Sequence, residues 1–320
     1  MIPGPRAAEL DPKAAEILTG ALSSERPNAH LLPVEEARRN FDSDFAELGP
    51  GEDVQRVEDI ALAVADGHVP ARLYRPGTGE LPGILYLHGG GWLLGSVESH
   101  DAICRALANA SGAVVLSVGY RRGPESRFPT AVEDAYAALL WLYDNAQSVG
   151  VRADALAVAG DSAGGNLATV VALLARDRGG PSLCFQVLAY PVTTTDLDIG
   201  FDPDFEGYFL YRDELQWHQD NYLRADADKE DPLVAPLISA ELDGLPPALI
   251  LTAGCDPLHA QGELYAEALD AAGVSVEHRV YPGMVHGFFQ MPSVFADGRD
   301  AVDAAGGALQ EAFAEKEVTR

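Results

Sequence analysis

Basic side chains are scarce in this chain of 320 residues. Lysines and arginines number 22 against 49 aspartates and glutamates, and the only lysines are Lys13, Lys229 and Lys316. The formal net charge is -27 at pH 7. Proteins that bind nucleic acid or anionic membranes present basic faces to them, so the composition argues against both kinds of partner. We interpret the excess of acid as a well-hydrated surface; adaptation to a salty cytoplasm would produce the same composition.

Cysteines and long apolar runs are also rare. Cys104, Cys184 and Cys255 are odd in number and far apart, which favours reduced thiols in a cytoplasm over disulfides or a zinc site. No apolar run reaches the roughly 18 residues that span a bilayer. The segment MIPGPRAAELDPK lacks the basic and apolar regions of a secretory signal. We therefore expect a cytoplasmic protein with no membrane span, and nothing in the sequence points to a metal or a cofactor.

Short apolar runs recur along the chain and alternate with helical patterns. The first two are joined by Ala65-Asp-Gly-His68 and predict a hairpin. The later runs are continuous and apolar, as in parallel strands covered on both faces. This order predicts an α/β fold with a mostly parallel, eight-stranded sheet flanked by helices. The expected strands are 54–64, 69–75, 83–88, 113–119, 155–160, 183–190, 248–253 and 274–281, and the expected helices are 130–147, the segment after Ser162, 258–272 and 299–314.

Two segments interrupt the alternation. Residues 1–50 predict short helical pieces broken by Pro27, Pro33 and Pro50. Residues 193–231 form a long, acidic, aromatic-rich insertion with a helix expected over 212–223. Loops of this length inside compact domains are usually functional lids. We expect a catalytic core formed by 51–192 and 232–320, and a helical cap formed by 1–50 and 193–231.

The stretch Gly160-Asp-Ser-Ala-Gly164 ends an apolar run and precedes a helical pattern. It matches G-x-S-x-G, a tight strand-to-helix turn that exposes a nucleophilic serine. Small residues are needed at the flanking positions of the motif, because a Cβ on its glycines would collide with the strand or the helix. Chance alone would produce the motif in roughly one such chain in seven, and a purely structural glycine-rich turn is the other interpretation.

A second glycine-rich loop, His88-Gly-Gly-Gly-Trp92, follows the third expected strand and precedes a helix expected to begin near Val97. Backbone N–H groups of such a loop can converge on an oxyanion because no side chain blocks the approach. Two independent motifs in matching positions favour catalysis over a structural turn.

A serine hydroxyl needs a base to remove its proton during attack. Where a serine lies on a turn of this kind, its partners follow in the order acid and then histidine. His286 lies in the loop after the last expected strand and is the candidate base. His278 lies inside that strand, where we expect it to pack against its neighbours.

The acid that orients the base should end the preceding strand. Asp256 does so directly, and it could also cap the next helix with Pro257 at the first helical position. Asp161 and Asp243 are alternatives, although Asp161 adjoins the serine too closely to reach the far nitrogen of the base. We expect His259 at the surface or beside the site.

Aromatic residues gather in and around the insertion. They could line an apolar slot for the acyl chain or simply fill the core of the cap. The strongest candidates for a pocket are Trp92, Tyr190, Tyr208 and Phe209, and Phe201, Phe205 and Trp217 complete the set. We expect uncharged esters with modest acyl chains, because a strongly negative protein repels anions.

The motifs together resemble the bacterial hormone-sensitive-lipase-like family of α/β-hydrolases, esterase family IV, in its GDSAG subgroup. The likeness covers most of 55–315. It is carried by HGGGW at 88–92, YRRGPESRFP at 120–129, GDSAGGNLA at 160–168, Tyr190-Pro191, DPLVAP at 231–236, Asp256-Pro-Leu258 and His286-Gly-Phe288. The resemblance implies an α/β-hydrolase fold and a metal-free carboxylesterase for short or medium acyl chains.

The resemblance also assigns roles to single residues. It implies Ser162 as nucleophile, His286 as base, Asp256 as its partner, and an oxyanion hole made by the N–H groups of Gly90, Gly91 and Ala163. A homodimer through the last strand and helix is a further implication. The chain departs from the family at His259-Ala-Gln-Gly262, where Arg-Asp-Glu-Gly is usual, and at Asp231, where serine is common.

Three other functions would use some of the same residues. Amide or formamide hydrolysis would use the same residues. An NADP-dependent oxidoreductase could use Gly89, Gly91 and Gly95 with Arg121 and Arg122, but this ignores the serine turn. A non-catalytic small-molecule receptor that resembles the family would lack the base, whereas His286 is present.

Overall fold

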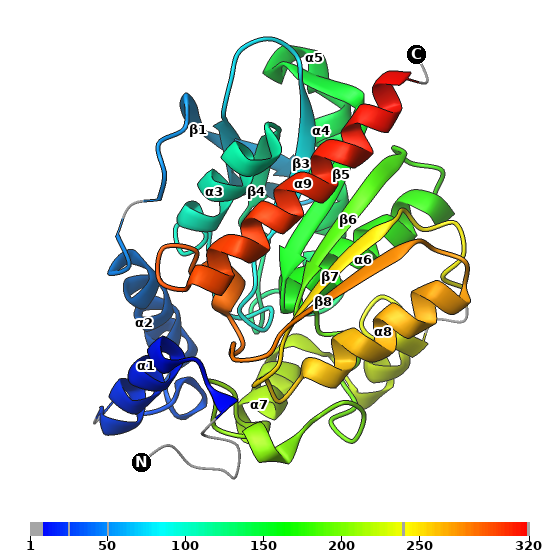
Figure 1. The fold of residues 1–320 in the computed structure, drawn as a ribbon. Coiled ribbons are helices and arrows are strands. Elements are labelled where there is room, and N and C mark those ends of the chain that lie inside the picture. The colour runs from blue at the N-terminus through cyan, green and yellow to red at the C-terminus, as the bar shows by residue number, and fades with distance from the viewer. Residues whose placement is uncertain (1–8, 25, 50, 239–240, 319–320) are drawn as a thin grey trace.

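A computed structural model describes residues 9–24, 26–49, 51–238 and 241–318, and Pro50 lies outside them. An eight-stranded sheet runs through the molecule in the order β1-β2-β4-β3-β5-β6-β7-β8 (Figure 1). β1 pairs antiparallel with β2 and β2 with β4, and every other pairing is parallel. The mostly parallel eight-stranded sheet is therefore confirmed. The strands are β1 Arg56–Val64, β2 Gly67–Arg75, β3 Leu81–Leu87, β4 Val114–Val118, β5 Val151–Asp161, β6 Leu183–Ala189, β7 Ala248–Ala253 and β8 Val276–Tyr281.

Helices cover both faces of the sheet. α3 and α9 pack on one face, and α4, α6 and α8 pack on the other (Figure 1). The helices are α1 Pro12–Ser23, α2 Val34–Ala46, α3 Asp101–Ser111, α4 Thr130–Asp144, α5 Ala146–Val149, α6 Ala163–Asp177, α7 Arg212–Tyr222, α8 His259–Ala271 and α9 Ala296–Val318. Short 3₁₀ helices occupy Ala29–Leu31, Pro203–Phe205, Asp226–Glu230, Pro236–Ile238 and Phe288–Gln290.

Strands such as β3 are apolar along their whole length because helices cover both faces of the sheet. In β3, Ile84 and Tyr86 face the α3 and α9 side, whereas Leu85 and Leu87 face the α4, α6 and α8 side. All four are fully buried. Because successive side chains of a strand point to opposite faces, a strand covered on both faces must be apolar throughout.

One helix begins later than expected. The helix expected near Val97 starts at Asp101, and residues 91–100 form turns instead. The Ser99 hydroxyl accepts a hydrogen bond from the Ser96 N–H, and the Ser96 hydroxyl accepts one from the Ser99 N–H. Serine side chains that bond nearby backbone groups compete with helix formation, which explains the delayed start.

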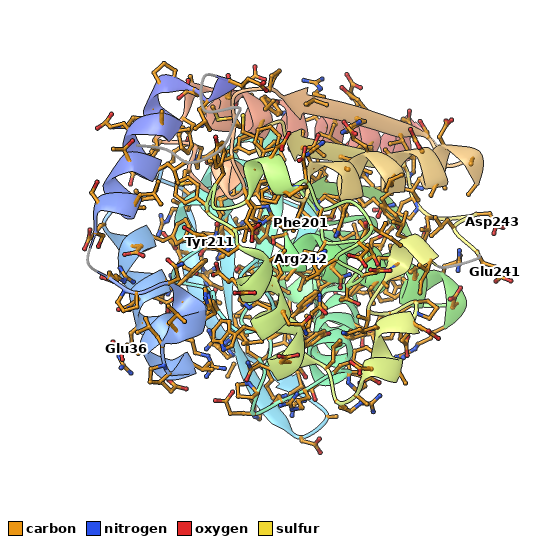
Figure 2. All side chains as sticks on the ribbon, turned by 90° about the horizontal axis from the view of Figure 1, so that it is seen from below. Glu36, Phe201, Tyr211, Arg212, Glu241 and Asp243 are labelled. Atoms are coloured by element: carbon orange, nitrogen blue, oxygen red, sulfur yellow. The ribbon has the colours of Figure 1, made fainter. Side chains whose placement is uncertain are left out.

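Three helices, α1, α2 and α7, lie over the carboxyl ends of the parallel strands, and we call them the covering helices (Figures 1 and 2). α1 begins sharply because the Asp11 carboxylate accepts hydrogen bonds from the N–H groups of Lys13 and Ala14. α2 is anchored by Arg38, which is buried and donates to the carbonyls of Leu93 and Gly123. This anchor holds α2 beside the residues that follow the HGGG loop.

Candidate active site

Ser162 lies on a sharp turn between β5 and α6. Its backbone has φ +54° and ψ -119°, and its N–H donates to the carbonyl of Ala189 over 2.9 Å. A Cβ on Gly160 or Gly164 would overlap backbone oxygen atoms of Gly164 or Leu87. The motif glycines are therefore a steric requirement of the turn, as the sequence predicted.

The loops after β5, β7 and β8 bring three side chains together. The His286 Nε2 lies 2.8 Å from the Ser162 Oγ, and the His286 Nδ1 lies 2.6 Å from the Asp256 Oδ2. With the proton on Nδ1, the imidazole donates to Asp256 and accepts from the serine hydroxyl. Ser162 and His286 are 124 positions apart in the chain, and they meet because the parallel strands end at one edge of the sheet.

Asp256 is fully buried and its two carboxylate oxygens serve different partners. Oδ2 accepts from His286, and Oδ1 accepts from the N–H of Leu258 over 2.8 Å. The carboxylate thus closes a turn ahead of the helix. Because α8 begins only at His259, the expectation that Pro257 is the first helical residue is wrong. The turn fixes the carboxylate in the orientation that the imidazole needs.

The other acids and histidines from the sequence lie elsewhere. Asp243 is exposed on a distant loop (Figure 2). His278 is half-buried and its Nε2 lies 2.9 Å from the Thr252 Oγ1, in keeping with a packing role. His259 is half-buried beside the site, where its Nδ1 lies 2.9 Å from the carbonyl of Asp256.

The HGGG loop brings backbone N–H groups to the cavity above Ser162. Gly90 and Gly91 have φ angles of +110° and +60° and both line this cavity. Their N–H groups make no hydrogen bond to any described residue. Ala163 is the first residue of α6, where a helical N–H has no intrahelical acceptor. The three residues thus offer donors to an incoming oxygen atom.

A buried network supports this loop, and sequence reasoning missed it. The Asp161 carboxylate accepts hydrogen bonds from the Tyr86 hydroxyl over 2.7 Å and from the Gly89 N–H over 3.1 Å. His100 lies 3.3 Å from the same carboxylate and contacts Gln290. Burial opposes ionisation of Asp161, yet His100 and the Tyr86 hydrogen bond outweigh it, and the pKa of Asp161 is lowered. Asp161 therefore holds the HGGG loop instead of the base.

A cavity of about 640 Å³ opens above Ser162 and His286, bounded by the covering helices and the HGGG loop. Among the expected pocket residues, Trp92, Tyr190 and Phe209 line it. Tyr208 does not: it is fully buried and packs edge-on against Phe205, with ring centroids 5.6 Å apart. The remaining expected aromatics, Phe201, Phe205 and Trp217, also lie outside the wall of the cavity.

The inner face of α7 carries two polar residues that sequence reasoning missed. Glu214 and His218 are four residues apart, one helical turn, and both line the cavity. The His218 ring packs directly on Gly91, where a Cβ would overlap it. Burial lowers the pKa of His218 to about 3, so the ring is neutral. The spacing on an expected helix was the signal that could have found this pair.

The two arginines that an oxidoreductase would need for a cofactor phosphate already have partners within the fold. Arg121 pairs with Asp134 over 2.7 Å, and Arg122 donates to the carbonyl of Gly95. Within the described residues, no group of three histidine, cysteine or acidic side chains is arranged to hold a metal ion. No helix in that part of the chain is long and apolar enough to cross a membrane.

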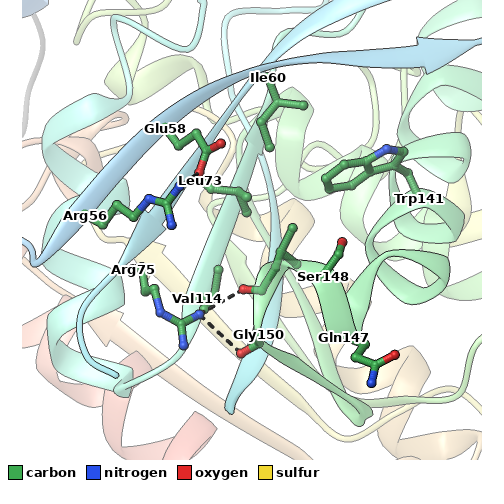
Figure 3. Close-up of a pocket in the computed structure, with 11 residues that line it drawn as sticks. Arg56, Glu58, Ile60, Leu73, Arg75, Val114, Trp141, Gln147, Ser148 and Gly150 are labelled. Carbon is green, nitrogen blue, oxygen red and sulfur yellow. Dashed lines mark hydrogen bonds and ion pairs between the residues drawn. The ribbon is translucent and has the colours of Figure 1, made fainter. Parts of the chain in front are cut away.

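A second cavity of about 540 Å³ is lined by residues of β1 and β2, by Val114 and Trp141, and by residues 147–150 before β5 (Figure 3). Its wall includes Arg56 and Arg75, which could in principle attract an anion. Arg75, however, donates to the carbonyls of Val149 and Gly150, and Arg56 pairs with Glu58. Backbone carbonyls thus hold the Arg75 guanidinium, and the Arg56 guanidinium lies in an exposed ion pair. This cavity shares no described lining residue with the cavity above Ser162.

Comparison with known proteins agrees with this geometry. A family model described as the α/β hydrolase fold matches residues 84–290. The chain is 41% identical to an ethyl acetate hydrolase of Pseudomonas putida over 290 residues, which cover 88% of this chain and 91% of the relative.

Solved structures give the same result. A hyperthermophilic esterase from Pyrobaculum calidifontis superposes with a TM-score of 0.89 at 40% identity, over 94% of this chain and 98% of the other. The ester hydrolase EH1AB1 from the metagenome of Lake Arreo superposes with a TM-score of 0.91 at 37% identity, over 95% and 99%. The chain therefore belongs to the α/β-hydrolase family, in its hormone-sensitive-lipase-like branch.

Proposed function

We propose that this protein is a carboxylesterase that hydrolyses short- to medium-chain acyl esters through Ser162, His286 and Asp256. The observation that carries the proposal is the position of His286, with one ring nitrogen on the Ser162 hydroxyl and the other on the buried Asp256 carboxylate. The esterase names of its relatives support ester over amide hydrolysis.

Acylation follows from the contacts of the site. Ser162 attacks the ester carbonyl while His286 accepts its proton, and Asp256 stabilises the imidazolium that forms. The negative charge on the carbonyl oxygen develops beside the N–H donors of Gly90, Gly91 and Ala163. His286 then protonates the leaving alcohol, which departs and leaves an acyl group on Ser162.

Deacylation repeats these steps with water. His286 removes a proton from a water molecule that attacks the acyl carbonyl, and the same donors hold the second oxyanion. His286 returns the proton to Ser162, and the carboxylic acid leaves. No further group is needed to balance the reaction.

The covering helices border the cavity above Ser162 and His286, as a cap would. We propose that 1–50 and 193–231 form the cap and that 51–192 and 232–320 form the catalytic core. A cavity of about 640 Å³ holds a small ester.

We also propose a homodimer that uses β8, an edge strand on which Val280 is 46% exposed. We further propose a cytoplasmic location.

The decisive variant is Ser162→Ala. It should lower kcat for p-nitrophenyl esters by about 10⁵-fold or more, because the nucleophile acts as a unit with its base. Ser148→Ala, at an exposed serine on α5, is the control and should keep the parent rate. A fluorophosphonate should label Ser162, as mass spectrometry of the adduct would show.

A series of acyl chain lengths tests the substrate class separately. Activity should peak at short or medium chains because the cavity is limited in volume. A Ser162→Ala protein with full turnover would remove the proposed mechanism, and a peak at long chains would remove the proposed substrate class.

A further inference from the structure

Glu214 occupies an unusual position for a carboxyl group. It is half-buried and lines the cavity beside His286, and its carboxyl makes no hydrogen bond or ion pair with any described residue. One turn further along α7, the Nδ1 of His218 is buried and has no partner either. The inner face of α7 therefore carries polar groups that the fold leaves unsatisfied.

Among the described residues of the cavity wall, no basic side chain pairs with Glu214. Arg26 is the one arginine in the described cavity wall, and it pairs with Asp44 over 2.7 Å. His218 on the same helix is neutral, and the other imidazoles facing this region are His286 and His30. Asp161, the third carboxyl of the wall, is already satisfied by the network behind the HGGG loop.

The surroundings make ionisation of Glu214 costly. Leu210, Leu215 and Phe209 line the same cavity. Burial raises the pKa of Glu214 to about 7, against the opposing effect of His286. Above this pH the cavity wall contains an uncompensated negative charge. A bound cation would offset that cost, since buried charges are stable when paired.

Aromatic side chains line the same cavity as Glu214. Phe41, Phe45, Trp92, Tyr190 and Phe209 all line the cavity, and aromatic faces attract ammonium groups. The net charge of -27 also raises the concentration of cations near the protein. A carboxylate and aromatic rings in one cavity are a combination that recognises alkylammonium groups.

We propose that Glu214 is a specificity-determining residue that binds an ammonium group of the substrate, so that cationic esters are preferred over neutral esters of the same shape. The inference rests on the proposed esterase function and names its substrate class. It replaces the expectation of uncharged esters, which rested on the exclusion of anions alone.

Two esters of equal shape test the proposal. 2-(Trimethylammonio)ethyl acetate and 3,3-dimethylbutyl acetate differ in a single atom, a cationic nitrogen in place of carbon. At pH 8 the parent protein should prefer the cationic ester by about tenfold or more in kcat/KM, and Glu214→Gln should lose this preference. Asp213→Asn removes an equal charge from the exposed face of α7 and should keep it.

The pH dependence provides a measurement on the unmodified protein. Glu214 ionises as pH rises through about 7, so the preference for the cationic ester should increase between pH 6 and pH 8. Any pH dependence of the steps that both esters share cancels in the ratio. In Glu214→Gln the ratio should stay flat.

The outcomes separate the two proposals. Hydrolysis of the neutral ester with a ratio that ignores both pH and Glu214→Gln overturns the cation site and leaves the esterase intact. If neither ester is hydrolysed, the esterase proposal fails, and calorimetric titration with choline at pH 8 decides the cation site. Choline should then bind the parent protein about tenfold more tightly than Glu214→Gln, and equal or absent binding overturns the inference.

Discussion

Four residues other than glycine have a positive backbone φ in the described part of the chain: Trp92, Ser162, Tyr190 and Phe209. All four line the cavity above Ser162. Such backbone conformations cost roughly 1–3 kcal/mol each and persist where the surrounding structure imposes them. Their concentration around one cavity indicates that packing energy is used there to aim particular atoms at a substrate.

At Gly91 the structure leaves no room for a side chain. Gly91→Ala should lower kcat/KM by about 10²-fold, because the new Cβ meets the His218 ring and displaces an N–H donor of the proposed oxyanion hole. Adding His218→Ala removes the obstructing ring and should restore a large part of the rate. The measurement is steady-state hydrolysis of a neutral p-nitrophenyl ester.

The double variant also provides the control. If Gly91→Ala alone keeps the parent rate, the N–H of Gly91 contributes little to the reaction. If the double variant is as slow as the single one, the loss comes from the backbone conformation at φ +60° and not from His218.

At the scale of elements, the packing of α9 on α3 closes one face of the sheet (Figure 1). Gly306 on α9 lies against Ala110 of α3 so closely that a Cβ would approach the Ala110 backbone within 2.7 Å. The next residue, Gly307, is exposed and has open space around its Cα. Two adjacent glycines of one helix thus have opposite structural roles.

This contrast predicts opposite changes in stability. Gly306→Ala should lower the free energy of unfolding by about 1–3 kcal/mol, because two backbones must move apart. Gly307→Ala should raise it by about 0.5–1 kcal/mol, because alanine is the better helix former. Urea denaturation followed by circular dichroism measures both. Equal effects from the two substitutions would contradict the close packing of α3 and α9.

At the scale of the whole molecule, the main feature is the excess of acidic over basic side chains. The 49 acidic side chains exceed the 22 basic ones by 27, and many arginines are already paired with acids, for example Arg72 with Asp59 and Glu98. The remaining carboxylates repel one another across the surface. Such self-repulsion destabilises the compact state.

Salt should therefore stabilise the protein. The Debye length falls from about 10 Å at 0.1 M salt to about 3 Å at 1 M, so Tm should rise between 0.05 M and 0.5 M salt and then level off. NaCl and KCl should act equally, because screening depends on ionic strength. Differential scanning fluorimetry measures the shift, and a Tm that falls over this range would contradict the argument.

Much of this molecule could be read from short segments of its sequence. The turn around Ser162 was predictable because its glycines meet a steric requirement within five consecutive residues. Continuous apolar runs predicted parallel strands because a sheet covered on both faces needs apolar residues throughout. The choice of Asp256 and His286 followed from strand order, since parallel strands deliver their loops to a single edge, and the distances between these side chains match that expectation.

Other features depended on contacts between distant segments. Phe209 lines the cavity while its neighbour Tyr208 is buried away from it, because the chain turns at Phe209 with φ +67°. Glu214 lines the same cavity because α7 lies across the carboxyl ends of the parallel strands. Spacing along a chain reveals which residues share a turn or a face, but the angle at which one element lies on another is set by packing over the whole fold.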